Sequence, residues 1–291
     1  LLAVLAGKRD LGEPLAGKST LNRLELTPLG SPVAERYHKI GYSAEALDEL
    51  LVDLFLEAHN QAPREIVLDL DATDTPLHGQ QEARFFHGYY GHYCYLPLYI
   101  FCGDHLLCAR LRPSNIDASA GSLEEVQRIV RQIRARWPKT RIILRADSGF
   151  CREELLAWCE TSHVHYVFGF ARNKRLRKII GRAMHQAKQE HQRTEKPARV
   201  FCEFAYRTKQ SWSRARRVVA KAEQIEGKEN PRYLGTSLDA QDWPAQKLYE
   251  QMYCARGEME NRIKEQLSLF ADRLSTETLR ANQLRLYFSS L

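Results

Sequence analysis

The sequence has no apolar run long enough to cross a bilayer and no cleavable export signal. Its apolar opening, Leu1 to Ala6, is far shorter than the roughly 20 residues that a membrane helix needs, and no basic region precedes it. Cysteine occurs seven times, but no two cysteines stand in a CxxC pair. We therefore expect a chain with reduced thiols, located in the cytoplasm, with no membrane partner.

Motifs of several enzyme classes are also missing. Four histidines cluster in sequence but show neither HExxH nor Cys/His spacing, which argues against a zinc site at His78, His87, His92 and His105. The Gly-Lys-Ser triplet at 17–19 lacks the earlier glycine and the preceding strand of a phosphate-binding loop. Internal repeats and low-complexity tracts are absent as well.

What the sequence does have is length and positive charge. Its 291 residues, 44% of them hydrophobic, can bury a sizeable core in one large domain or in one domain that carries an insertion. The formal net charge is +7, spread along the chain. This excess permits a polyanionic partner such as nucleic acid but does not by itself indicate one.

The hydrophobic pattern predicts alternating strands and helices. Apolar residues recur at three- and four-residue steps after Ser43, which predicts a serine-capped helix to about His59. Ser122 and Glu125 form a capping box for a second helix, which Pro138 ends. From residue 66 onward the predicted order is βββαβαβ, with strands at 66–71, 93–102 and 106–111, a helix from 122, a strand at 141–146, a helix at 153–160 and a strand at 165–170.

Between residues 172 and 244 the pattern changes, and we interpret this stretch as an inserted β-rich subdomain with strand-like runs at 200–208, 216–224 and 232–236. Helical character returns from about Ala245. The predicted fold class is α/β, a mixed sheet flanked by helices. Its predicted parts are a partial helical or linker region at 1–60, a core made of 61–171 and 245–291, and the insertion at 172–244.

Three acidic residues stand where this fold would bring them together. Asp71 ends the first strand, Asp147 follows the fourth, and Glu260 lies in the late helix. Sites in α/β folds commonly lie beyond the carboxyl ends of strands. Converging carboxylates repel one another unless cations lie between them, and Mg²⁺ prefers such oxygen ligands. The pattern therefore indicates a metal site suited to phosphoryl transfer.

The late helix also carries a basic and aromatic stripe around Glu260. Tyr253, Arg256 and Lys264 stand at steps of three or four residues, so they share one helical face with Glu260. Arg256 and Lys264 suit contacts with DNA phosphates. The alternative is an exposed helix stabilised by ion pairs of Glu260 with these two residues, each worth about 0.2–0.5 kcal/mol.

Three segments carry a resemblance to a known family: LDLDATDTPLHGQQ (68–81), LRADSGFCREELLAWCE (144–160) and YCARGEMENRIKE (253–265). The chain resembles bacterial insertion-sequence transposases of the DDE type, which have an RNase-H-like (retroviral-integrase) fold. It is most similar to the subgroup with a tyrosine, arginine, glutamate signature and a β-rich insertion before the glutamate. The resemblance covers most of the chain.

The resemblance implies a metal-dependent endonuclease and strand-transferase that acts as a homodimer on double-stranded DNA, at the ends of an element and at the target. It implies two Mg²⁺ ions, replaceable by Mn²⁺, on Asp71, Asp147 and Glu260. It also implies DNA contacts for Tyr253, Arg256 and Lys264. The lysine departs from the broad signature, in which it lies further beyond the glutamate, at the position of Leu267, so its role stays open.

Asp69 is an alternative to Asp71 as the first metal ligand, because alternation places both on one face of the strand. We prefer Asp71, since the family's aspartate usually precedes a small residue and threonine, as Asp71 precedes Ala72 and Thr73.

Two further features are candidate DNA contacts. Arg172 and Lys174 open the densest basic run, which suits a loop that tracks phosphates or, equally, an ordinary solvated face. Trp212 lies among basic residues, where it would stack on an unpaired base or simply pack in the fold.

Because the sequence begins without methionine, we expect a fragment that lacks an N-terminal DNA-binding region. Two alternatives to an active transposase stay open. One is a truncated remnant that binds DNA but cannot transpose, and the other is an RNase-H-like nuclease without strand transfer. For the main hypothesis we expect the protein in the bacterial cytoplasm, associated with the nucleoid.

Overall fold

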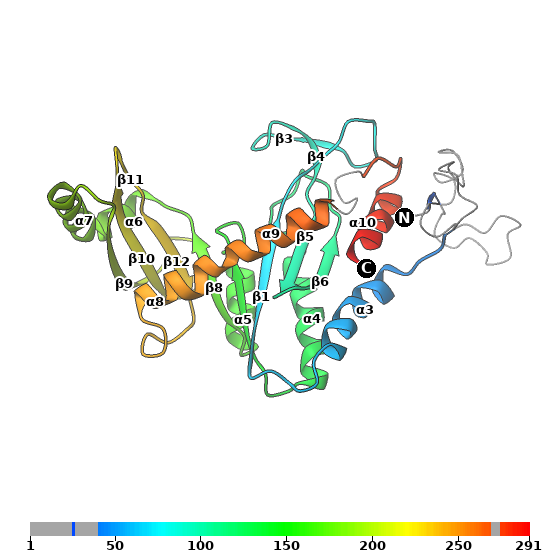
Figure 1. Ribbon diagram of the computed structural model, residues 1–291, viewed down its shortest axis with the longest axis horizontal. Coiled ribbons are helices and arrows are strands. Elements are labelled where there is room, and N and C mark those ends of the chain that lie inside the picture. Colours follow the sequence, from blue (N-terminus) through cyan, green and yellow to red (C-terminus); the bar gives the residue numbers. More distant parts are fainter. Residues whose placement is uncertain (1–24, 27–39, 269–273) are drawn as a thin grey trace, which may run out of the picture.

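The protein is built around one long mixed sheet (Figure 1). The computed structural model describes residues 25–26, 40–268 and 274–291, so most of the predicted region 1–60 lies outside the described residues. In this part of the chain the sheet order is β11-β10-β12-β8-β7-β1-β5-β6, with β9 paired to β10. The strands are β1 (Glu65–Ala72), β5 (Leu98–Cys102), β6 (His105–Arg110), β7 (Arg141–Ala146), β8 (His165–Phe170), β9 (Ala198–Tyr206), β10 (Arg216–Ile225), β11 (Lys228–Glu229) and β12 (Arg232–Thr236).

The central part of this sheet confirms the predicted α/β class and the predicted order βββαβαβ, realised as β1, β5, β6, α4, β7, α5 and β8. β1 and β7 run parallel, as do β7 and β8, whereas β5 and β6 are antiparallel. The predicted strand at 93–102 is in fact broken at Leu96 and Pro97. Its first half joins a small separate sheet formed by β2 (Thr75–Pro76), β3 (Phe85–His87) and β4 (His92–Tyr95).

Helices cover both faces of the sheet, because successive strand residues alternate between two apolar layers. One layer packs against α3 (Ala44–Glu57), α4 (Ser122–Arg136), α5 (Glu153–Thr161), α6 (Lys174–Ile179) and α7 (Gly181–Thr194). The opposite layer packs against a late helical segment and α10 (Leu279–Ser290). The late segment consists of α8 (Ala245–Lys247), a π-helix η2 (Leu248–Tyr253), a 3₁₀ turn η3 (Cys254–Arg256) and α9 (Gly257–Gln266). It crosses the sheet from β12 to β5 (Figure 1).

The strands of the predicted insertion, residues 172–244, continue the central sheet. β12 pairs antiparallel with β8 from Tyr233↔Phe170 to Thr236↔Val167, so the strands of 172–244 extend the central sheet. β10 in turn pairs with β12 and β9, and α7 packs on β9 and β10. Backbone hydrogen bonds therefore continue from the insertion into the core.

Of two helix caps predicted from the sequence, one is confirmed and one is wrong. Ser43 caps α3 as predicted, since its Oγ accepts a hydrogen bond from the Ala46 amide at 3.2 Å. The capping box predicted at Ser122 is wrong. Ser122 is the first residue of α4, and the residue before it is Gly121 with φ +74°, a left-handed conformation that glycine adopts freely.

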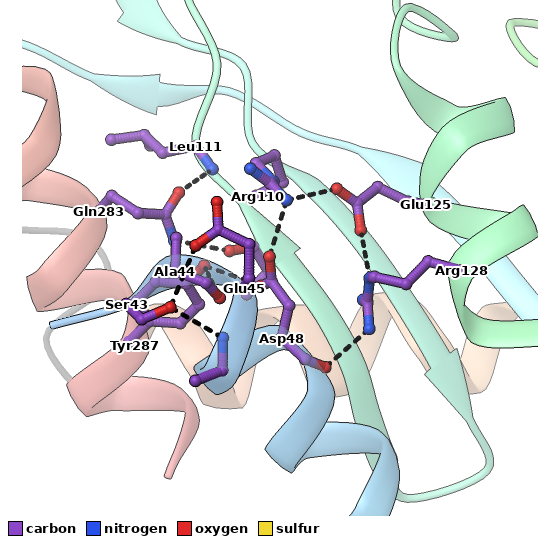
Figure 2. A network of polar contacts seen from close by, with 12 residues as sticks. Ser43, Ala44, Glu45, Asp48, Arg110, Leu111, Glu125, Arg128, Gln283 and Tyr287 are labelled. Atoms are coloured by element: carbon purple, nitrogen blue, oxygen red, sulfur yellow. Dashed lines mark hydrogen bonds and ion pairs between the residues drawn. The ribbon is translucent and has the colours of Figure 1, made fainter. Parts of the chain in front are cut away.

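A buried polar network fastens the terminal helices to the sheet (Figure 2). Asp48 of α3 accepts hydrogen bonds from Arg110 of β6 and from the hydroxyl of Tyr287 of α10, both at 2.7 Å. Arg110 also pairs with Glu125 of α4 at 2.6 Å. Burial raises the pKa of Asp48, partly offset by the Tyr287 hydroxyl and by Arg110. Three elements far apart in sequence thus meet at the Asp48 carboxylate, and Arg110 joins α4 to them.

Gln283 of α10 completes the edge of the sheet. β6 is the last strand on its side, and its free edge meets α10. The Gln283 side chain accepts a hydrogen bond from the Leu111 amide at 2.6 Å and donates one to the Ala109 carbonyl at 2.9 Å. A side-chain amide thereby takes the place of a neighbouring strand at this edge.

We predict that Gln283→Leu destabilises the protein by about 1–3 kcal/mol, because it leaves a buried amide and a carbonyl without this partner. Urea denaturation followed by circular dichroism measures the change. Gln186→Leu, at an exposed position of α7, is the control and should stay within about 0.5 kcal/mol of wild type. Equal stability of the two variants would contradict the role assigned to Gln283.

Candidate active site

Two of the three predicted carboxylates lie side by side at the end of adjacent strands. β1 and β7 are parallel and in register up to the pair Leu70↔Ala146, and Asp71 and Asp147 each follow directly. Both therefore emerge at the same sheet edge. The Asp71 charge also interacts with that of Asp147. The expectation that the strands bearing the two aspartates are neighbours is confirmed.

Asp147 is held by its own turn. The Gly149 amide donates a hydrogen bond of 2.8 Å to Asp147 Oδ1, so the carboxylate is fixed just beyond β7. The same region is packed tightly against Gly169 of β8. A Cβ at Gly169 would lie 2.7 Å from the Tyr253 hydroxyl, 2.9 Å from the Ser148 nitrogen and 3.1 Å from the Asp147 carbonyl carbon. Only glycine fits there.

Sequence reasoning missed Gly169. The signal was available, since an isolated glycine inside a strand marks a close approach of another backbone or a ligand. In this protein two groups come close to Gly169. One is the backbone at Asp147, and the other is Tyr253, which the late helix places over the end of β8.

A buried ion pair sets the position of the late helix. Arg145 of β7 donates to both carboxylate oxygens of Asp69, at 2.5 and 2.7 Å, and to the Met252 carbonyl at 2.6 Å. Met252 lies in η2, the π-helical stretch, where a side chain that binds a backbone carbonyl accounts for irregular helix geometry. The role of Arg145 was not foreseen from the sequence.

This ion pair also bears on the choice between Asp69 and Asp71. Asp69 is 5% exposed, and both of its oxygens are engaged by Arg145. Asp71 instead faces Arg256 at a more open position, with its Oδ1 accepting from the Ala72 amide at 2.9 Å. The geometry favours Asp71 as the carboxylate available to an external ligand.

Arg256 lies between the first aspartate and the glutamate. Its guanidinium is 3.5 Å from Asp71 Oδ2 and 3.0 Å from Glu260 Oε1. The Glu260 side chain is 50% exposed and is linked to Asp71 through this arginine. Among the described residues no three acidic, histidine or cysteine side chains lie close enough together to enclose a metal ion.

The electrostatics of Asp71 nevertheless suit a cation. The pKa of Asp71 is raised to about 6, because burial, Asp147 and Glu260 raise it by more than Arg256 and the Ala72 amide lower it. A single guanidinium therefore compensates the buried negative charge incompletely. Carboxylate oxygens are the donors that hard divalent ions prefer, so the residues present fit Mg²⁺ or Mn²⁺.

Two of the remaining predicted residues, Tyr253 and Arg172, line one cavity. Tyr253 lines a cavity of about 500 Å³ together with Ser148 and Arg172. Sequence reasoning did not single out Lys228 and Arg232, basic residues that line the same cavity. Lys174, at the start of α6, and Lys264, on α9, are exposed.

Of the two alternatives left open for Trp212, the structure supports packing in the fold over stacking on a DNA base. The side chain is 3% exposed and stacks on Phe170, with ring centroids 4.8 Å apart. It belongs to the core between the sheet and the insertion, so it is not accessible to a DNA base. Its apolar area, buried against Phe170 and Tyr206, outweighs the basic sequence context that suggested DNA contact.

The family model of the transposase DDE domain group 1 matches residues 1–291, the whole chain. The chain belongs to this transposase family. The predicted membership is thus confirmed. No curated protein matches the chain. Among solved structures, it is similar to the piggyBac transposase in a cryo-EM structure of its synaptic complex with hairpin DNA, at 11% identity and a TM-score of 0.47. The match covers 79% of this chain and 46% of that one.

For this transposase domain we predict that Asp71→Asn raises stability at neutral pH when no divalent metal is present. Between pH 3.8 and about 6 the folded state keeps a proton that the unfolded state releases, so the stability of the wild type falls as pH rises through this window. The pKa displacement sets an upper limit of about 3 kcal/mol. Urea denaturation in EDTA should show the variant about 1–3 kcal/mol more stable at pH 7 and equal to wild type near pH 4.

The matched control is Asp242→Asn at an exposed position, which should have no such effect. An Asp71→Asn variant that is less stable than wild type at pH 7 would show that the Asp71 charge stabilises the metal-free fold.

We further predict that Gly169→Ala costs about 1–3 kcal/mol of stability, because the added methyl group meets backbone atoms that cannot move cheaply. It should also displace the Asp147 turn and lower metal affinity, as measured by isothermal titration with Mn²⁺. Gly181→Ala, where a Cβ meets nothing within 4 Å, is the control. If Gly169→Ala bound Mn²⁺ with unchanged affinity, Gly169 would not be needed to position the metal ligands.

Proposed function

We propose that this chain carries out the chemistry of DNA transposition: metal-dependent cleavage of a DNA strand, followed by transfer of the freed 3′ end into a target. The observation that carries the proposal is the parallel pairing of β1 and β7. It sets Asp71 and Asp147 at one sheet edge, beneath the helix that bears Glu260. Membership of the transposase family supports it.

In this proposal Asp71, Asp147 and Glu260 hold two Mg²⁺ ions, for which Mn²⁺ substitutes. When bound, such ions activate the attacking oxygen and stabilise the leaving one in phosphoryl transfer. In this proposal the Glu260 side chain turns inward, since it is half exposed and Arg256 is its one ion-pair partner among the described residues. Arg256 would then leave the carboxylates and meet a DNA phosphate, a partner that suits a guanidinium equally well.

The cavity beside Asp147 suggests the path of the DNA. Arg172, Lys228 and Arg232 give it positive charge, and Tyr253 places a hydroxyl at its rim. Lys174 and Lys264 would extend phosphate contacts on either side. We infer that double-stranded DNA, both element ends and target, binds along this face. We also propose that two copies act together as a homodimer on paired ends, in the cytoplasm at the nucleoid.

We also propose a division of the chain into a catalytic core and an insertion. Residues 61–171 and 245–291 would form the catalytic core, and 172–244 would support the DNA from strands that continue the core sheet.

We predict that Asp147→Ala lowers Mn²⁺-dependent nicking of supercoiled plasmid by at least about 100-fold, because one anchor for the ions is lost. Gel electrophoresis of the products measures the rate. Asp242→Ala, an exposed acidic residue, is the control and should keep wild-type activity. Persistent activity in Asp147→Ala would overturn the site assignment.

A second assay measures the joining of a pre-cut 3′ DNA end to plasmid DNA. Joining supports a transposase. Cleavage without joining would indicate an RNase-H-like nuclease, and DNA binding without either reaction would indicate an inactive remnant.

A further inference from the structure

A hairpin rich in exposed aromatic residues stands next to the candidate active site. This aromatic hairpin, residues 84–95, consists of β3, a glycine-containing turn and β4. β4 is joined to β2, which begins four residues after Asp71, through the pairs Thr75↔Tyr95 and Pro76↔Cys94. It projects beyond the end of the central sheet (Figure 1). The hairpin contains none of the three carboxylates proposed to hold the metal ions.

Its side chains expose aromatic surface to water. Phe85 is 40%, Phe86 57%, Tyr89 86% and Tyr93 42% exposed. These four are nearly half of the nine large hydrophobic residues exposed in the described part of the chain, although the hairpin is only twelve residues long. Exposed apolar residues that cluster in this way mark a binding surface more often than exposed apolar residues scattered singly over the protein.

Three of these rings contact neighbouring aromatic rings. Phe86 and Tyr93 are paired across the two strands and meet edge to face with centroids 5.6 Å apart, and the Arg84 guanidinium lies 4.0 Å from the centroid of the Tyr93 ring. Tyr89 meets Tyr90 edge to face at 5.0 Å. Gly91, with φ +75°, allows the tight turn. Rigid aromatic side chains lose little conformational freedom when they bind a partner.

The hairpin is tied to the carboxylate end of β1. His92 Nε2 lies 2.7 Å from Asp74 Oδ2, so β4 is anchored three residues beyond Asp71. Tyr90, in the turn, is within electrostatic reach of both Asp74 and Asp71. A DNA strand positioned for reaction at Asp71 would therefore pass close to the exposed rings.

The surroundings favour a nucleic acid over a second protein copy. Stable protein interfaces bury about 1,200–2,000 Å² in total, whereas these rings lie on one narrow hairpin among arginine, histidine and glycine. Aromatic rings with a cation beside them are a surface on which bases of any sequence stack. Bases that stack on protein must first be unpaired from their own strand partner.

We propose that the aromatic hairpin is a stacking platform for unpaired bases of the DNA held at Asp71 and Asp147. Phe86 and Tyr89, the two most exposed rings of the hairpin, make the stacking contacts. Tyr93 of β4 supports the Phe86 ring, and the Arg84 guanidinium lies over the Tyr93 ring. The proposal rests on the proposed function, which supplies the DNA, and adds a contact that no part of the carboxylate chemistry requires.

The test compares two DNAs that differ only in pairing: a duplex with a three-nucleotide unpaired stretch containing 2-aminopurine, and the fully paired duplex. Binding is measured with Ca²⁺ in place of Mg²⁺, so that no cleavage takes place. Wild-type chain should quench the 2-aminopurine of the unpaired DNA and bind that DNA more tightly. The double variant Phe86→Ala with Tyr89→Ala should bind it about 10- to 100-fold more weakly, lose the quenching, and bind paired DNA within about two-fold of wild type.

Phe288→Ala, at a position of α10 that is 57% exposed, is the matched control and should behave as wild type. Phe86→Trp with Tyr89→Trp should retain both binding and quenching, whereas leucine at both positions should lose them. This contrast separates stacking from apolar contact alone.

Equal losses for paired and unpaired DNA, or no loss, would overturn the proposal. So would a double variant that binds DNA normally but loses dimerisation in sedimentation velocity, since a second copy would then be the partner. If wild type quenches 2-aminopurine but never cleaves DNA, the proposed function fails while the stacking platform stands. If wild type cleaves and joins DNA but the hairpin variants bind normally, only the platform fails.

Discussion

The pairing of Arg145 with Asp69 fixes the geometry on which the candidate site depends. A guanidinium buried between β1, β7 and the late helix has to have its hydrogen bonds satisfied, because an unpaired buried charge is strongly unfavourable. It obtains them from both Asp69 oxygens and from the Met252 carbonyl. The last of these contacts sets where the late helix crosses the strands, and hence where Tyr253, Arg256 and Glu260 can reach.

Around the Arg145–Asp69 pair, the two carboxylates of β1 have different partners. Asp69 is neutralised by a dedicated partner, while Asp71, two residues further on the same strand face, shares Arg256 with Glu260. One carboxylate is thus committed to the fold and its neighbour is left for a ligand. The difference arises from position: Asp69 lies beneath the helix and Asp71 at the strand end.

Much of the fold could be predicted from the sequence because its signals are local. β7, β8 and β12 begin and end where alternation and turn residues place them, and α3 begins at its serine cap. The neighbouring positions of Asp71 and Asp147 also followed from strand order. Relations between distant segments could not be predicted in this way. The pairing of β12 with β8, the burial of Trp212 on Phe170 and the engagement of Met252 by Arg145 each join residues more than 40 positions apart.

The strand register between β12 and β8 has a consequence for protein engineering. Because β12 of the insertion shares a hydrogen-bonded ladder with β8, the strand that contains Gly169, the two cannot separate without breaking backbone hydrogen bonds. Exchanging residues 172–244 for the equivalent piece of another transposase would mean cutting through a continuous sheet. A chimera would keep its fold only if the incoming strand preserved the pairing of Gly235 with Phe168. Junctions placed in loops outside β8 and β12 are therefore safer.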